Sequence, residues 1–278
     1  MLEKTLSKQI LDFVRIKPRT IQEIAFLIKK NWRTADRYVE ILSTETGFIS
    51  TRTFREGSRG ALKLVYWNSL ESNKGTAYQE RLLQKILNGK HKEDFSAFDI
   101  YQFVPANKRE AYIEDTEFSS HPKINYNTLL QSAQQQILLF SGNLSWLDQG
   151  AEMLKTIQKI AANKIHVKIL TRVDITSKEK IKKVLSINEQ AGWDSLQIRH
   201  CQQPLRALII DDKFFTIKEI FTPIRHKELS KNVFLFYRIE DPEWINWTQK
   251  IFWHLWEQSI DAQTRLDALA TLQAGNNA

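Results

Sequence analysis

Residues 20–67 read TIQEIAFLIKKNWRTADRYVEILSTETGFISTRTFREGSRGALKLVYW, and this stretch decides the fold of the N-terminal part of the chain. Apolar residues recur at helical spacing over 20–30 and again over 31–42, with a tight turn between the two segments. Residues 48–55 and 61–67 are typical of strands, and the two glycines of EGSRG (56–60) give the turn between them its freedom at positive φ. The stretch therefore predicts two helices followed by a β-hairpin.

Polar residues mark where these helices start. Thr20 and Glu23 match a capping box, in which each side chain satisfies a backbone N–H at the helix start, and Asn31 can cap the next helix. Apolar residues at helical spacing over 6–14 predict a further helix before them. Three helices and a hairpin in this order indicate a winged helix-turn-helix, so residues 1–70 are predicted to be a DNA-binding domain.

The charge distribution agrees with this prediction. Residues 1–70 hold 13 Lys and Arg against 7 Asp and Glu, a net charge of +6 out of +8 for the 278-residue chain. A local excess of this kind is what phosphate neutralisation requires, because released counterions dominate non-specific affinity for nucleic acid.

The start of the second helix of the pair carries the candidate base-reading residues. An exposed arginine there suits base reading, because arginine holds O6 and N7 of guanine with two hydrogen bonds. The alternative is a solvated face in which Arg33 pairs with Asp36 and Arg37 with Glu40. The predicted contacts in this helix are Asn31, Trp32, Arg33, Thr34 and Arg37.

The hairpin supplies a second set of cations. Side chains around its tip are positioned for phosphates or for the minor groove. The alternative is a charged edge that discourages strand-to-strand aggregation. The predicted contacts in the hairpin are Arg52, Arg55, Arg59 and Lys63.

The rest of the chain is predicted as a connector (71–124), an α/β domain (125–260) and a tail (261–278). An amphipathic helix is expected over 76–87 as a dimerisation or linker helix or one docked on the second domain, and the sequence does not decide between these. In the α/β domain we expect helices over 127–136, 147–162, 178–191 and 243–260, and strands over 137–140, 165–170, 196–199, 205–210, 213–218 and 232–239. Near-continuous apolar strands alternating with helices predict a mostly buried sheet, so the overall fold class is α+β and α/β.

The segment RHCQQPLRALIIDDKFFTIKE (199–219) resembles a degenerate phospholipase D-like motif, and also the sensor domains of archaeal TrmB-type winged-helix regulators. The active family pattern is His-x-Lys, four residues, then Asp, with Gly-Ser and Asn downstream. Aligned on Asp211, Pro204 takes the histidine position, Arg206 the lysine position and Lys218-Glu219 the Gly-Ser position. The resemblance implies a phospholipase D-like sandwich over 125–260.

The departures from that pattern predict that the protein is not an enzyme. Phospholipase D chemistry needs a histidine nucleophile, and proline cannot act as one. His200 lies four residues upstream of Pro204, roughly 13 Å along an extended strand. The remaining polar groups are instead expected to hold a small anionic effector at Arg199, His200, Arg206, Asp211 and Lys218. The alternative is that Asp211 and Asp212 simply form a turn and that Arg206 is an exposed strand residue.

No metal site or cofactor is expected, because the histidines lack ligand spacing and Cys201 is the only cysteine. The tryptophan-rich segment 243–260 leaves little polar face, which favours core packing and, in addition, a homodimer interface. A twofold protein would suit a palindromic DNA site. The chain has no apolar run of about 18 residues and starts without the apolar core of a signal peptide, so we expect no membrane contact and a reducing cytoplasmic location.

Together these patterns predict a sequence-specific transcription regulator that binds double-stranded DNA. Its winged helix would contact DNA, and its inactive phospholipase D-like domain would provide dimerisation and effector sensing. Two alternatives remain at this stage. One is a phosphodiesterase or nuclease with an atypical site, and the other is a winged-helix module that binds proteins.

Overall fold

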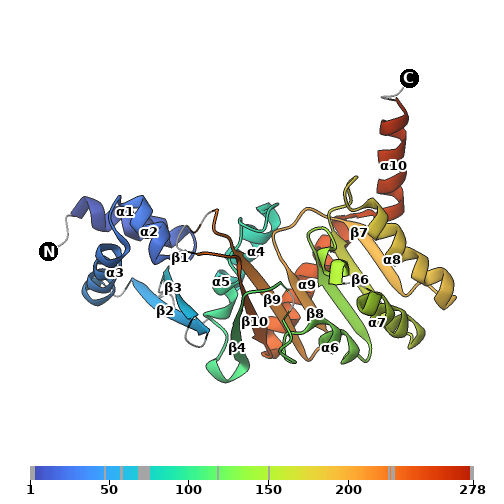
Figure 1. Ribbon diagram of the computed structural model, residues 1–278, viewed down its shortest axis with the longest axis horizontal. Coiled ribbons are helices and arrows are strands. Elements are labelled where there is room, and N and C mark those ends of the chain that lie inside the picture. The colour runs from blue at the N-terminus through green and yellow to red at the C-terminus, as the bar shows by residue number, and fades with distance from the viewer. Residues whose placement is uncertain are drawn as a thin grey trace.

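The computed structural model describes residues 4–275, except 47, 57, 58, 68–75, 118, 150, 225, 227 and 228. An N-terminal unit (residues 4–67) holds three helices and a small antiparallel sheet (Figure 1). A larger C-terminal unit (residues 76–275) is built on an eight-stranded sheet. The chain is therefore a mixed helix-and-sheet protein, as predicted.

The N-terminal unit contains the predicted elements, and its sheet has the order β1-β3-β2. Thr20 Oγ1 accepts the Glu23 N–H at 3.1 Å and Glu23 Oε2 accepts the Thr20 N–H at 2.8 Å, which confirms the capping box. The second helix is shorter than predicted, because Lys29 has a φ of 54° and turns the chain towards the next one. The elements are α1 (Lys4–Ile16), β1 (Arg19–Thr20), α2 (Ile21–Leu27), α3 (Trp32–Thr46), β2 (Ile49–Glu56) and β3 (Arg59–Trp67).

The sheet of the C-terminal unit has the order β11-β7-β6-β5-β8-β9-β10-β4. Strands β5, β6 and β7 are parallel, whereas the other pairings are antiparallel. The strands are β4 (Arg109–Glu114), β5 (Gln136–Phe140), β6 (His166–Thr171), β7 (Leu196–His200), β8 (Ala207–Ile210), β9 (Phe214–Phe221), β10 (Val233–Ile239) and β11 (Ile260–Asp261). The helices are α4 (Thr76–Asn88), α5 (Phe98–Tyr101), α6 (Tyr126–Gln131), α7 (Ala151–Ala162), α8 (Lys178–Ala191), α9 (Pro242–Gln258) and α10 (Ala262–Gly275), with 3₁₀ turns at Ala106–Lys108 and Ser145–Gln149.

Helices cover both faces of this sheet, so its central strands are buried. Helices α6, α7, α8 and the base of α10 form one apolar core with one face. Helices α4, α5 and α9 form the other core with the opposite face. The expected sandwich of helices around a mostly buried sheet is therefore present.

The clearest differences from the predictions lie in three segments of the C-terminal unit. The sheet begins inside the predicted connector, because β4 pairs with β10 as its edge strand. The helix predicted over 127–136 ends at Gln131, since the Asp211 carboxylate accepts the backbone N–H groups of Gln134, Gln135 and Gln136 at 2.9–3.0 Å and holds them out of the helix. The predicted tail forms α10, which stands away from the sheet (Figure 1).

The N-terminal unit is docked onto the C-terminal unit through its hairpin. Alternate residues of β2 and β3, Phe54, Leu62 and Leu64, are buried in the same core as α5 and β10. The Phe54 ring lies 6.2 Å from that of Phe98 and 6.2 Å from that of Tyr237, centroid to centroid. The opposite hairpin face packs on α1–α3. The hairpin is therefore held between two cores, and the boundary predicted near residue 70 falls outside the described residues.

The tryptophan-rich helix α9 is accounted for within one chain. Trp244 and Trp256 are buried, and Trp247 and Trp253 are partly buried against the same core. Core packing is thus confirmed, and the apolar composition of this helix no longer requires a second chain. In the described part of the chain, no helix is long and apolar enough to cross a membrane.

Candidate functional site

The start of α3 presents polar side chains to solvent, as predicted. Asn31, Arg33 and Arg37 are exposed, and the Trp32 side chain is 49% exposed. Asn31 Oδ1 accepts both the backbone N–H of Thr34, at 2.9 Å, and its hydroxyl, at 3.1 Å. The cap therefore occupies Asn31 and Thr34, and the charged groups available at this helix start are the two arginines.

Asp36 and Glu40 of α3 pair with the hairpin and not with these arginines. Lys63 Nζ on β3 lies 2.6 Å from Asp36 Oδ1 and 3.4 Å from Glu40 Oε1. Among the described residues, neither Arg33 nor Arg37 has an ion pair, and the Arg33 guanidinium lies 5.5 Å from the Trp32 ring centroid. Lys63, predicted as a DNA contact, therefore forms an internal bridge from hairpin to helix, and its contact with DNA stays a prediction.

Of the three hairpin arginines, the structure describes the side chain of Arg52. Arg52 lies on the face of β2 that meets the C-terminal unit, with its guanidinium 5.1 Å from the Tyr101 ring centroid. The side chains of Arg55 and Arg59 lie outside the described part of the structure. Sequence reasoning missed Phe26 on α2, which is 81% exposed because it falls off the apolar stripe of that helix.

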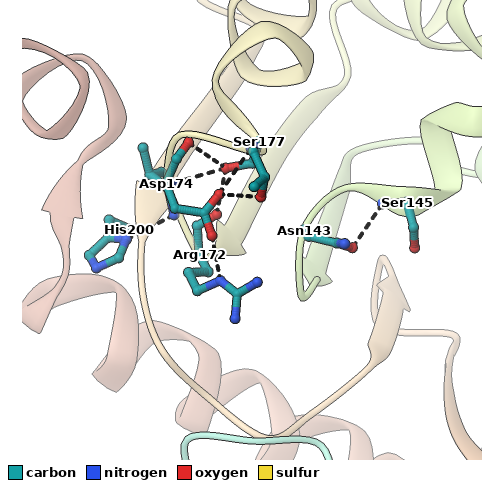
Figure 2. Close-up of polar contacts among 8 residues, drawn as sticks. Asn143, Ser145, Arg172, Asp174, Ser177 and His200 are labelled. Atoms are coloured by element: carbon teal, nitrogen blue, oxygen red, sulfur yellow. Dashed lines mark hydrogen bonds and ion pairs between the residues drawn. The ribbon is translucent and has the colours of Figure 1, made fainter. Parts of the chain in front are cut away.

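Three of the five residues predicted for an effector pocket have structural roles elsewhere. Asp211 caps backbone N–H groups ahead of β5, which stabilises its ionised form and lowers its pKa even though burial opposes this. Arg199 donates to the Trp256 carbonyl at 2.8 Å. His200 Nδ1 accepts the Val173 N–H at 2.9 Å, and burial lowers its pKa, with the charge of Arg265 adding to the effect (Figure 2). None of these three residues lines the cavity that holds the other two predicted residues.

The other two predicted residues, Arg206 and Lys218, come together on one face of the sheet. They are cross-strand neighbours, because the Lys218 N–H donates to the Arg206 carbonyl at 3.0 Å. Both line a cavity of about 350 Å³ at the end of β5, together with Lys92, Glu117 and Arg172. We call this the cation cavity, since four of these five charged residues are basic.

Two loops complete the cation cavity. The loop 141–145 follows β5, and Arg172 follows the parallel strand β6, so both lie at the same sheet edge. Arg172 Nε donates to Asp174 Oδ2 at 2.7 Å, and Asn143 Oδ1 accepts the Ser145 N–H at 3.2 Å (Figure 2). Sequence reasoning missed Lys92, Glu117 and Arg172, which only the tertiary fold brings to this edge.

The electrostatics of the cavity favour an added negative charge. Lys218 is 9% exposed, and burial lowers its pKa although Glu117 Oε1 lies 2.7 Å from its Nζ. Burial also lowers the pKa of Arg206, and the charge of Arg172 acts in the same direction. The cations therefore oppose one another in a partly desolvated space.

Comparisons with known proteins found no family model and no curated protein that matches this chain. Among solved structures, the chain is similar to TrmBL2, described as an archaeal chromatin protein with a novel mode of DNA binding. The identity is 15%, the TM-score is 0.40, and the match covers 93% of this chain and 94% of that one. The phospholipase D family member Nuc from Salmonella typhimurium matches at 13% identity and a TM-score of 0.40, over 55% of this chain and 98% of its own. NucT from Helicobacter pylori matches at 14% identity and a TM-score of 0.39, over 55% and 99% respectively. Likeness at this level does not transfer an activity to this chain.

Metal ligation is not a feature of the described residues. Within ranges 4–46, 48–56, 59–67 and the described part of 76–275, no group of three His, Cys, Asp or Glu side chains has a metal-binding arrangement. Cys201 is partly buried, and burial raises the pKa of its thiol to about 11, so it stays protonated near neutral pH.

Proposed function

We propose that this protein is a sequence-specific DNA-binding transcription regulator. Its N-terminal unit has the element order of a winged helix-turn-helix, with α3 as the recognition helix and the β2–β3 hairpin as the wing. In this proposal the C-terminal unit is a catalytically inactive phospholipase D-like domain that supports dimerisation and senses an effector.

One observation carries the proposal. Arg33 and Arg37 are exposed near the start of α3 and have no ion pair among the described residues, because Lys63 takes the neighbouring carboxylates. Neutralising Asp36 and Glu40 from the hairpin also removes negative charge that would repel a phosphate backbone. An exposed helix start with available guanidinium groups is suited to bidentate contact with guanine in the major groove.

The proposed lack of catalysis rests on the groups around the cation cavity. Pro204 occupies the motif position of the histidine nucleophile. Its ring packs near Gly89, because a Cβ built at Gly89 would lie 2.8 Å from Pro204 Cγ. No histidine belongs to the described lining of the cation cavity. His200 accepts a backbone hydrogen bond on β7, two strands away from β5. These residues do not support covalent phosphodiester chemistry.

The proposal includes a homodimer, because a palindromic DNA site is matched by a protein with twofold symmetry. Helix α10 is anchored at its base by Ala262 and Leu266, which are buried, and Leu272 near its end is 63% exposed. We propose that a second copy of the chain covers this part of α10.

DNA binding by fluorescence anisotropy tests the proposal. A duplex selected from a genomic pool and a random duplex are titrated at about 50 and about 200 mM salt, where phosphate contacts predict a steep loss of affinity. Arg33→Ala/Arg37→Ala is expected to lose about 10-fold or more in affinity for the selected duplex and much less for the random one, because base contacts carry specificity.

The matched control is Lys155→Ala/Lys159→Ala. It removes the same charge from exposed positions on α7, at the far end of the molecule (Figure 1). It is expected to keep the preference for the selected duplex. Absence of binding at low salt would reject the regulator and favour a protein-interaction module.

A further inference from the structure

The cation cavity holds more positive charge than its own carboxylates balance. The described part of its lining contains Lys92, Arg172, Arg206 and Lys218 but a single acidic residue, Glu117. Buried or partly buried charges in proteins are normally paired, because desolvation penalises an isolated ion. Like charges placed directly opposite each other on adjacent strands, as Arg206 and Lys218 are, also destabilise a sheet.

Arg206 is a partly buried cation of the cavity that has no carboxylate partner among the described residues. Among the described residues it forms no ion pair, although the charges of Glu93 and Glu117 act on it. Its Nη1 donates to the Leu205 carbonyl at 2.7 Å, which fixes one side of the guanidinium. The group lies against Gly142, where a Cβ would come within 2.6 Å of Nη2 and 2.8 Å of Nε. Glycine at 142 thus permits the guanidinium to lie at the cavity wall.

The position of the cavity in the sheet is one that suits a ligand. The parallel strands β5 and β6 both end here, and β5 has the antiparallel strand β8 on its other side. Ligands of open α/β sheets bind at the carboxyl ends of strands where the strand arrangement reverses. The volume of about 350 Å³ lies near the lower end of the roughly 300–1,000 Å³ typical of small-molecule sites.

We infer that the cation cavity binds a small molecule through a phosphate group, with Arg206, Arg172 and Lys218 as its ligands. Arginine forks match phosphate oxygens with two parallel hydrogen bonds, and lysine adds a point charge. Asp174 already holds Arg172 by its Nε, so its terminal nitrogens are oriented in advance. Serine hydroxyls of the loop 141–145 supply further polar groups at the wall.

Glu117 is the internal competitor of this ligand. Its Oε1 accepts from Lys218 Nζ at 2.7 Å and from Ser145 Oγ at 3.2 Å, so it occupies one of the cations that a phosphate would use. Removing its charge is therefore expected to tighten phosphate binding, the opposite of removing a cation.

The regulatory role of this ligand rests on the proposed function, since the bound molecule would be the effector of the DNA-binding unit. Arg206 and Lys218 also line a smaller cavity, of about 100 Å³, whose lining includes Lys17, Pro18 and Leu64 of the N-terminal unit. A ligand that draws these two cations towards the end of β5 would therefore also change the lining of the cavity shared with the N-terminal unit.

Isothermal titration calorimetry on the full chain, without DNA, tests the inference. Inorganic phosphate and glycerol 3-phosphate are the probes, and glycerol is the uncharged control. Saturable 1:1 binding of either phosphate probe, with none for glycerol, is expected. Tighter binding of glycerol 3-phosphate would identify an organic phosphate ester as the source, whereas equal or tighter binding of the free ion would identify inorganic phosphate.

Three variants locate the binding. Arg206→Gln is expected to weaken it by about 10- to 100-fold, the loss of a charge-assisted hydrogen bond. Gly142→Ala is expected to weaken it without changing any charge, because the new Cβ displaces the guanidinium, which is the far end of a flexible side chain. Glu117→Gln is expected to tighten it by about 10-fold, a change that misfolding would not produce.

Lys159→Gln on α7 is the control for net charge and is expected to bind as the wild type does. Thermal unfolding of each variant shows that it is folded. The inference is overturned if neither phosphate probe binds, or if Arg206→Gln and Gly142→Ala bind them as well as the wild type. Because no DNA is present, these outcomes are independent of whether the N-terminal unit binds DNA.

Discussion

Phe54→Ala tests whether the N-terminal and C-terminal units unfold as one body. The Phe54 ring belongs to the hairpin, yet three of its aromatic neighbours, Phe98, Tyr101 and Tyr237, lie in the C-terminal unit with ring centroids 6.2–6.5 Å away. Only 7% of the residue is exposed, so almost all of its apolar surface is buried at the junction.

The expected loss of stability follows from that burial. Truncating a buried phenylalanine to alanine costs about 3–5 kcal/mol, from the lost transfer free energy and the cavity that is left. Native proteins are stable by about 5–15 kcal/mol in total, so the loss is a large share. Because the lost contacts join the two units, we expect one unfolding transition in the wild type and two in Phe54→Ala.

Differential scanning calorimetry with urea denaturation measures both effects. Phe48→Ala is the matched control, since Phe48 is 42% exposed and stacks on Trp67 within its own unit. It is expected to lower stability by less and to keep a single transition. Two transitions in the wild type, or a loss below about 1 kcal/mol in Phe54→Ala, would refute the shared core.

Three further predictions concern buried charge and assembly. Burial raises the pKa of Glu219 from 4.5 to about 7, so between these pH values the carboxyl group is protonated in the folded state and ionised in the unfolded state. The free energy of unfolding should therefore fall by about 3 kcal/mol as the pH rises from about 4.5 to about 7, and urea denaturation of Glu219→Gln should show this fall removed. Asparagine at 211 tolerates the φ of 47°, but Asp211→Asn replaces the charged carboxylate that accepts three backbone hydrogen bonds with a neutral amide. It should cost about 2 kcal/mol in urea denaturation, whereas an unchanged midpoint would contradict the capping role. Light scattering should find a dimer for the wild type and a monomer for Leu272→Glu, and a monomeric wild type would remove α10 as an interface.

The N-terminal unit could be predicted closely because its signals are local. The capping box at Thr20 and the Asn31 cap use residues three positions apart, and the hairpin is marked by its own turn. The helix predicted over 127–136 failed for the opposite reason. Its last residues are held by Asp211, which lies more than 70 positions away and carries no local signal.

The cation cavity shows the same limit. Arg206 and Lys218 could be predicted from the sequence because they lie on either side of the β8–β9 turn, within the segment aligned with the phospholipase D-like motif. Glu117 lies 101 positions before Lys218, Arg172 lies about 30 positions before Arg206, and both reach the cavity only through the strand order. Strand β4 was missed because its six residues are all half-buried at a sheet edge and show no alternation.

Methylation interference on the selected duplex tests the central claim most directly. If α3 reads the major groove through Arg33 and Arg37, methylation of guanine N7 within the site will block wild-type binding. The Arg33→Ala/Arg37→Ala protein will have lost that pattern while it keeps salt-dependent affinity for any duplex. Interference confined to minor-groove positions, or an unchanged N7 pattern in the double variant, would contradict the assignment of α3 as the recognition helix.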